Sequence, residues 1–332
     1  MPGLSDLLRI YAAKEPVWGT KVTPATVAIM GVKDLKLTPV VEGEVLKDMR
    51  GAFLHGAMAV IKKVGMTGSL NRYATYEDAP YVLDALCGLA TPVFTTVYTY
   101  SYAAPGTGTI PNARIQTLYE ASNDANSLQA YYAATGFTLK KWVLKAATNE
   151  PVEFSEDYIG KQVLSAVVGD IGSLSDRVVI PIMGNDHTLF IDAWGGTIGT
   201  TAITPDAYDL EISIETGRDL VYSLGSALPY TWKDARWKGS MKLVMEFNTA
   251  TKVYYDAILA ATSNFQKLIR NKFTNATQSF TVDFAGTNVK SPALFTNKNG
   301  VLTVELELDG TYNPTMANWF KAVAVNTITT MA

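Results

Sequence analysis

The chain has 332 residues, of which 48% are hydrophobic and 18% charged, and its formal net charge is −3. The composition is that of a folded chain, and the length suits about two domains of ordinary size. The slight acidic excess argues against a protein that holds nucleic acid by its phosphates, because such proteins carry a surplus of Lys and Arg. The single cysteine, Cys87, rules out an intrachain disulfide and a cysteine zinc site.

The first residues do not predict a targeting signal. Met1 to Ser5 are followed by Asp6, which is not the basic, apolar and small-residue order of a signal peptide. The longest apolar runs are interrupted by polar residues well short of a membrane span. We therefore expect a protein without a membrane span that is made in a cytoplasm.

The first half opens with strands and a long loop. Residues 1–30 predict an arm and a first strand, and residues 34–38 alternate polar and apolar as a half-buried strand does. Glu42 to Lys63 mixes glycine with charges of both signs, which predicts a long loop between strands. Gly68 to Tyr76 predicts the next strand. Asp78 then marks the start of a short helix that runs through Leu86.

Further strands and a second helix follow. Val93 to Tyr102 and Phe137 to Leu144 predict strands, because they are rich in β-branched and aromatic residues. Glu215 to Lys238 predicts a second long loop, and Asn248 or Thr249 begins a helix that ends near Ala261. The last expected strands are Ser279 to Phe284 and Val301 to Leu308, and residues 160–175 carry the join between the halves.

Four anchors recur in the same order in the second half. Trp18-Gly19-Thr20 returns as Trp194-Gly195-Gly196-Thr197, an offset of 176 positions. The other anchors are Asp34 to Leu37 with Asp209 to Ile212, Gly68 to Leu70 with Gly239 to Met241, and Tyr81 to Leu86 with Tyr255 to Ile258. A long offset that stays nearly fixed indicates a duplication. We predict a mainly β fold of two similar sandwich or barrel domains, 1–165 with an N-terminal arm and 166–332, each with one short helix.

No catalytic or cofactor motif is present in the sequence. His55 and His187 are the only histidines, and both fall in turn-like surroundings that predict solvated loop residues. Cys87 lies in a mostly apolar run, which predicts a buried structural thiol. We therefore expect no enzyme activity, no cofactor and no metal.

The order of several segments resembles the tail tube proteins of bacteriophages with long, non-contractile tails. The resemblance covers nearly all of residues 10–165 and, more faintly, the second half. It differs in the duplication, since many tail tube proteins have one tube domain. The segments that carry it are Ala13 to Thr20 with Pro24, Leu35 to Leu37 with Arg50-Gly51, Tyr76 to Leu86, Tyr98 to Tyr100, Gly136 to Lys140 and Glu150 to Phe154.

The resemblance implies a structural protein of the virion tail that stacks as rings into a tube. The rings would be hexamers, or trimers of the duplicated chain with pseudo-sixfold symmetry. Double-stranded DNA would cross the lumen without sequence-specific binding, so we expect a neutral to acidic lumen. Further implied partners are the tail tip or initiator, the tape measure and the terminator proteins.

The contacts between subunits are expected at two matched aromatic residues, at the two helices and in the two long loops. Trp18 and Trp194 are either equivalent anchors or ordinary buried aromatic residues, and Asp84 and Asp256 either solvated helix residues or charge contacts. The full set is Trp18, Glu42, Glu44, Lys47, Asp48, Arg50, Asp84, Trp194, Arg218, Asp219, Trp232 and Asp256.

Two other functions compete with this one. A tail terminator or head decoration protein would also be a β-rich virion protein with long loops. A β-sandwich module or hydrolase acting on carbohydrate would use exposed aromatic rings as stacking platforms, and Trp142, Trp232 and Trp237 are the candidates.

Overall fold

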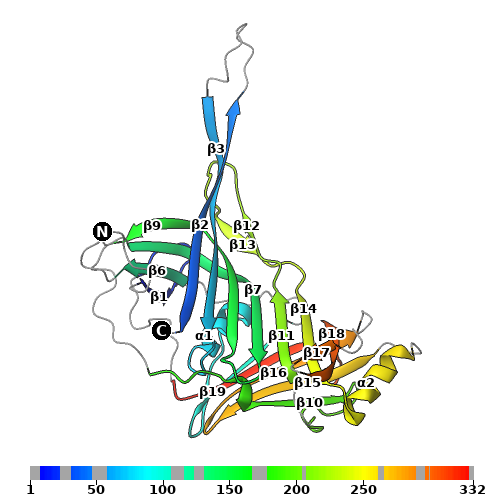
Figure 1. Ribbon diagram of the computed structural model, residues 1–332. Coiled ribbons are helices and arrows are strands. Elements are labelled where there is room, and N and C mark those ends of the chain that lie inside the picture. The colour runs from blue at the N-terminus through cyan, green and yellow to red at the C-terminus, as the bar shows by residue number, and fades with distance from the viewer. Residues whose placement is uncertain are drawn as a thin grey trace.

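The computed structural model describes residues 8–22, 31–46, 58–105, 116–122, 131–166, 178–203, 207–260, 265–288, 296–298 and 300–328. In this part of the chain the fold is mainly β, and two short helices accompany the strands (Figure 1). The predicted fold class is therefore confirmed. None of the described helices has the length and apolar character needed to cross a membrane.

The largest sheet, which we call the front sheet, combines strands of both halves of the chain. Its strands are antiparallel and their order is β2-β3-β8-β7-β11-β14-β18-β17. Their bounds are β2 Val32–Leu46, β3 Met58–Tyr73, β8 Glu153–Gly160, β7 Tyr131–Ala147, β11 Ala207–Glu215, β14 Lys238–Glu246, β18 Val301–Gly310 and β17 Thr296–Lys298.

Two further sheets pack with the front sheet, and the back sheet is also joined to it, because residues 286–288 of β16 pair with residues 308–310 of β18. The back sheet has the order β10-β15-β16-β19-β5-β4, and the side sheet is β1-β6-β7-β9, so the long β7 belongs to two sheets. Their bounds are β10 His187–Ala193, β15 Gln266–Asn275, β16 Gln278–Asn288, β19 Phe320–Asn326, β5 Tyr98–Ala103, β4 Val93–Phe94, β1 Leu8–Lys14, β6 Gln116–Ser122 and β9 Gln162–Ala166. A separate ribbon pairs β12 Asp219–Val221 with β13 Thr231–Lys233.

The strand pairings recur in the two halves of the chain. β2 pairs with β3 and β3 with β8, and in the same way β11 pairs with β14 and β14 with β18. β1 pairs with β6 as β10 pairs with β15. Each second strand, β3 or β14, is followed by a helix. Trp18 and Trp194 both follow the first strand of their half, which is what the sequence repeat predicts.

One hydrophobic core nevertheless extends through both halves. Trp142 of β7 makes edge contacts with Phe154 of β8 and with Phe320 of β19, and Phe154 contacts Phe280 of β16. These rings are buried between the front and back sheets. The division into two domains at residue 165 stays a prediction, because the buried cluster is continuous from Ile10 to Ala324.

The two helices begin where the sequence predicts. α1 spans Ala79–Cys87 with Asp78 at its N-cap, and Gly88 ends it at a φ of 108°, a conformation that favours glycine. α2 spans Thr249–Leu259, and the Asn248 side chain accepts hydrogen bonds from the amides of Ala250 and Thr251 in a capping box.

The predicted loop from Glu42 to Lys63 is wrong at both ends. β2 continues to Leu46 and β3 already begins at Met58, while residues 47–57 lie outside the described part. Glu42 lies opposite Lys63, and the two side chains form an ion pair of 3.5 Å. Mixed charges therefore stabilise a projecting hairpin stem here. The stem extends beyond the rest of the front sheet (Figure 1).

Replacing Trp142 tests the shared core. The ring is fully buried, so Trp142→Ala should lower the free energy of unfolding by about 3–5 kcal/mol in a denaturant titration. Lys145→Ala, on the exposed side of the same strand, should change it by less than about 0.5 kcal/mol. Equal effects of the two variants would contradict packing of the front sheet on the back sheet at Trp142.

Candidate assembly surface

The front sheet has an internal seam and open ends. β7 of the first half pairs with β11 of the second over seven residues, from Lys141 opposite Glu215 to Ala147 opposite Asp209. Among the described residues, β2 pairs only with β3 and β17 only with β18. Unpaired strand edges are templates for another strand, so the outer edge of β2 is a candidate assembly edge. At the other end of the described sheet only the three residues of β17 offer such an edge, because residues 308–310 of β18 pair with β16.

The outward side of the front sheet is polar, with charges of both signs. Ion pairs cross the seam, with distances of 3.1 Å from Lys141 to Glu215 and 3.7 Å from Lys145 to Glu211. Lys242 and Glu305 form a further pair of 2.7 Å on β14 and β18. These lysines and glutamates are partly exposed, so each pair contributes little to stability. Each of these pairs combines one positive and one negative charge, so the pairs add no net charge to the face.

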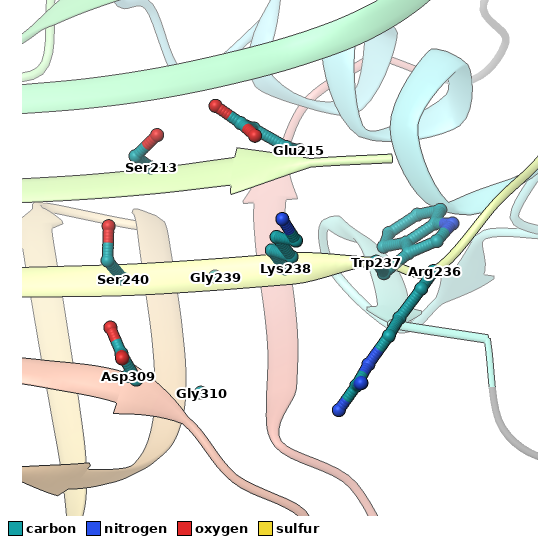
Figure 2. A pocket seen from close by; sticks show the side chains of 9 residues that line it. All are labelled: Ser213, Glu215, Arg236, Trp237, Lys238, Gly239, Ser240, Asp309 and Gly310. Atoms are coloured by element: carbon teal, nitrogen blue, oxygen red, sulfur yellow. The ribbon is translucent and has the colours of Figure 1, made fainter. Parts of the chain in front are cut away.

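Shallow depressions lie along this polar face. Figure 2 shows one of them, where Ser213 and Glu215 of β11, Ser240 and Lys238 of β14, and Asp309 of β18 line up on neighbouring strands. The lining alternates hydroxyls with opposite charges. The described residues hold no group of His, Cys, Asp and Glu that could bind a metal ion. The polar residues that line the depressions continue along the face of the sheet.

Arg218, predicted as a contact between rings, is fully buried within the chain. Its guanidinium donates hydrogen bonds to the carbonyl oxygens of Ala85 (2.5 Å) and Leu86 (2.9 Å) at the end of α1. It also binds the carbonyl oxygen of Leu139 and the carboxylate of Asp234. Burial lowers the pKa of Arg218, and the Asp234 carboxylate partly offsets this effect. Arg218 thus ties the segment after β11 to the first helix.

The indole rings of Trp232 and Trp237 pack against the Arg218 guanidinium within the chain. The ring centres of Trp232 and Trp237 lie 5.0 and 5.9 Å from its guanidinium carbon. Trp142 lies in the core without exposed surface. The arrangement gives no support to the alternative in which these three rings form a platform for carbohydrate. Asp219 is exposed, and its carboxylate accepts a hydrogen bond from the amide of Leu220.

The matched acids on the two helices differ in their surroundings. Asp84 is buried and accepts hydrogen bonds from the Tyr102 hydroxyl (2.9 Å) and the Ala90 amide (3.1 Å). Burial, followed by the Asp84 charge, raises the pKa of Tyr102, so its hydroxyl stays protonated and donates. The solvated position predicted for Asp84 is therefore wrong. Asp256 is exposed and pairs with Lys252 one turn earlier.

Trp18 stabilises the point where β7 passes from one sheet to the other. Its indole Nε1 donates to the carbonyl oxygen of Gly136 (3.1 Å), and the buried Glu15 carboxylate accepts from the Gly136 amide (2.8 Å). Gly136 has a φ of 64°, and a Cβ there would lie 2.9 Å from the Trp18 ring. The Lys161 ammonium lies 5.3 Å from the centre of that ring. Trp18 is partly buried in its own half of the chain.

Trp194 is also partly buried, and it packs against Leu268, Ala285 and Met316. Its carbonyl oxygen accepts a hydrogen bond from Asn313. The loop that follows is held by Asp192, which accepts from the amides of Gly199, Thr200 and Thr201.

Two of the remaining predicted contacts, Glu42 and Glu44, lie on the hairpin stem. Glu42 and Glu44 are exposed and pair with Lys63 and Lys62 across the two strands. Lys47, Asp48 and Arg50 lie outside the described residues, as does His55.

The solvated loop predicted for His187 is wrong. His187 begins β10 after a short 3-10 turn, Gly184–Asp186, and is partly buried. Its Nε2 lies 3.0 Å from Oδ1 of Asn271, and its ring packs on Phe273. Cys87 is partly buried against the core, and burial raises the pKa of its thiol, in keeping with the structural role predicted for it.

Sequence reasoning missed the exposed apolar side chains. Val41 and Ile61 lie on one side of the hairpin stem, and Val253 and Leu259 lie on α2. A signal was present in the stem, because Val45 and Ile61 are β-branched residues inside a segment interpreted as a charged loop, and Val41 directly precedes that segment.

No protein-family model and no curated protein matches the chain. The resemblance to tail tube proteins accordingly stays an expectation. The function that follows is argued from the geometry of the front sheet.

Replacing Arg218 tests its internal role. Arg218→Ala leaves the carbonyl oxygens of α1 and the Asp234 carboxylate buried without their donor, and should lower the free energy of unfolding by roughly 3–5 kcal/mol. Arg236→Ala, at an exposed arginine in the same segment, should change it by less than about 0.5 kcal/mol. Denaturant titration of both variants gives the comparison. Similar small effects would contradict a structural role for Arg218.

Proposed function

We propose that the protein is a structural subunit that joins edge to edge into closed rings, which stack into the tail tube of a bacteriophage. The observation that carries the proposal is the β7–β11 seam. It connects two sets of strands with the same pairing order, while the outer edges of β2 and β17 have no strand partner among the described residues. A second copy can repeat the seam at these edges.

The register indicates which part of β2 would form the new seam. β11 uses Asp209 to Glu215 to pair with β7. Asp34 of β2 matches Asp209 of β11, and both residues follow a register shift against the next strand, so the matching part of β2 is 34–40. Pro39 falls inside this part, and proline cannot donate to a ladder. A seam at β2 would therefore receive no donated bond from this residue.

Each chain contributes two sets of strands to such an assembly. A head-to-tail contact that closes on itself generates a ring, and closure removes every open strand edge. Three copies would give six sets, which is the pseudo-sixfold ring that the resemblance implies. Several rings stacked on one another would form a tube.

The polar side of the front sheet suits the lining of a channel for DNA. Several of its lysines are paired with acids across the strands, as Lys141 is with Glu215 and Lys242 with Glu305. A surface with a surplus of lysine would hold phosphates and slow the passage of DNA. The paired charges give a face with little attraction for a polyanion. In this proposal the protein binds no cofactor and catalyses no reaction.

The projecting β2–β3 stem suits contact with the next ring. It extends past the body of the sheet and carries exposed Glu42, Glu44, Lys62 and Lys63 (Figure 1). The proposed partners at the ends of the tube are the tail tip or initiator and the terminator protein, and the tape measure would lie in the lumen. The proposed location is the tail of the virion.

Electron microscopy of the concentrated protein tests the proposal directly. We expect closed rings or hollow tubes whose end views show six lobes, and sedimentation at the mass of three chains for a single ring. A protein that sediments as a monomer at every concentration, and adds to no preformed tube end, would overturn the proposal.

Two consecutive proline variants test the open edge of β2. Neighbouring residues of an edge strand direct their amides to opposite sides of the strand. One of the variants Leu35→Pro and Lys36→Pro therefore removes a hydrogen bond to β3, and the other removes an amide on the open side of β2. The variant that loses the free amide should unfold at nearly the wild-type temperature and fail to form rings. If the variant that remains folded forms normal rings, pairing at β2 is wrong.

A further inference from the structure

The core side of the front sheet continues into the β2–β3 stem. Leu35 and Leu37 of β2 pack against the core. Alternate residues of a strand share one side, so Val41 lies on this core side as well. Ile61 of β3 lies opposite Gly43, two residues after Val41, and directly opposed residues also share one side. The core side of the stem is therefore apolar.

This core side is left open to solvent in the stem. The exposed fractions of Val41, Val45 and Ile61 are 59%, 47% and 63%. The stem stands alone at the top of the molecule (Figure 1). The side of the front sheet that packs on the back sheet lower down thus has no cover from its own chain at these three residues.

The core side of the back sheet is left open at β4. Tyr100 and Tyr102 of β5 are buried in the core, and Tyr98, on the same side of this strand, packs against it. Phe94 of β4 lies opposite Tyr98, and their ring centres are 4.8 Å apart. Phe94 therefore lies on the core side too. Its exposed fraction is nevertheless 60%, so the front sheet does not cover it.

The two open surfaces lie at opposite ends of β3. The stem contains the first residues of this strand, and Tyr76 follows shortly after its last residue. The Asn326 side chain donates a hydrogen bond of 2.9 Å to the carbonyl oxygen of Tyr76. Asn326 of β19 pairs with Tyr98, the strand partner of Phe94. Figure 1 accordingly shows β19 in the lower part of the molecule, far from the stem.

The two overhangs are complementary. The front sheet projects beyond the back sheet at one end of β3, and at the other end the back sheet extends beyond the cover of the front sheet. Their core sides face each other within one chain, so a second copy displaced along β3 brings the overhang of its back sheet opposite the stem. A head-to-tail contact of this kind does not close on itself and extends a stack.

We infer that the Val41 and Ile61 side of the stem packs against Phe94 of a copy in the next ring. The inference rests on the proposed stacking of rings and names the surface that receives the stem. The contact would repeat between copies the packing of front sheet on back sheet that forms the core of one chain. It removes apolar area of both overhangs from water, which favours association.

Cysteine crosslinking of assembled tubes tests the contact. In a Cys87→Ser background, Val41→Cys and Phe94→Cys are combined in one chain and treated with a short thiol-specific crosslinker. The two positions lie at opposite ends of the chain, so each crosslink joins two copies. We expect covalent oligomers on a denaturing gel. The matched control carries Val93→Cys in place of Phe94→Cys.

The control differs only in the side of β4 that it presents. Val93 is exposed to 65%, but it precedes Phe94 directly and lies opposite Thr99, so it lies on the outer side of the back sheet. We expect this variant to remain largely monomeric on the gel.

A charge at Phe94 gives a second measurement. Phe94→Asp should leave ring formation and the unfolding temperature unchanged, and should raise the protein concentration at which rings stack into tubes about tenfold or more. Val93→Asp should leave that concentration unchanged.

The outcomes separate the contact from the assembly. Tubes of the Val41→Cys and Phe94→Cys variant without covalent oligomers would overturn the contact and leave the proposed function intact. Stacking of Phe94→Asp rings at the wild-type concentration would do the same. A wild-type protein that forms neither rings nor tubes would overturn the proposed function, and the contact with it.

Discussion

The backbone ladder between β7 and β11 is the constraint on which the rest of the structure depends. A strand edge has amides and carbonyl groups that need partners. Without the seam, the first half would have an open edge at β7 and the second half an open edge at β11. The seam satisfies one edge from each half. Because the seam fixes the register, it places Trp142 of β7 and Ile212 of β11 on the same side of one sheet, where both are buried in a single core.

The seam requires β7 to be long and bent. Its first part pairs with β6 and β9 and its second part with β8 and β11, so the strand changes sheets within 17 residues. Gly136 provides a backbone conformation that other residues adopt at a cost. Trp18 and Glu15 bind its carbonyl oxygen and amide, so the segment after the first strand stabilises the bend. The internal role of Trp18 follows from this geometry.

The sequence predicts the local features of the fold better than its long-range contacts. α2 begins directly after its N-cap Asn248 because a capping box is encoded within four residues, and β18 is evident from the alternation of its second half. Arg218 could not be placed in the same way. A charged residue between Gly217 and Asp219 is typical of a solvated loop, and only the tertiary fold brings the carbonyl oxygens of α1 to it. The stem was missed because its ion pairs become visible only when the register across the two strands is known.

A contact within the chain and a contact between copies make different demands. Within the chain, Arg218 can remain buried because its partners are assembled once, during folding, and the hydrogen bonds offset the cost of removing its charge from water. A contact between copies must form from surfaces that are solvated beforehand. A buried charge would then have to lose its water at every association, whereas apolar side chains gain free energy when they leave water. In the proposed assembly, duplication therefore fixes every second contact within one chain and leaves the alternate contacts to association.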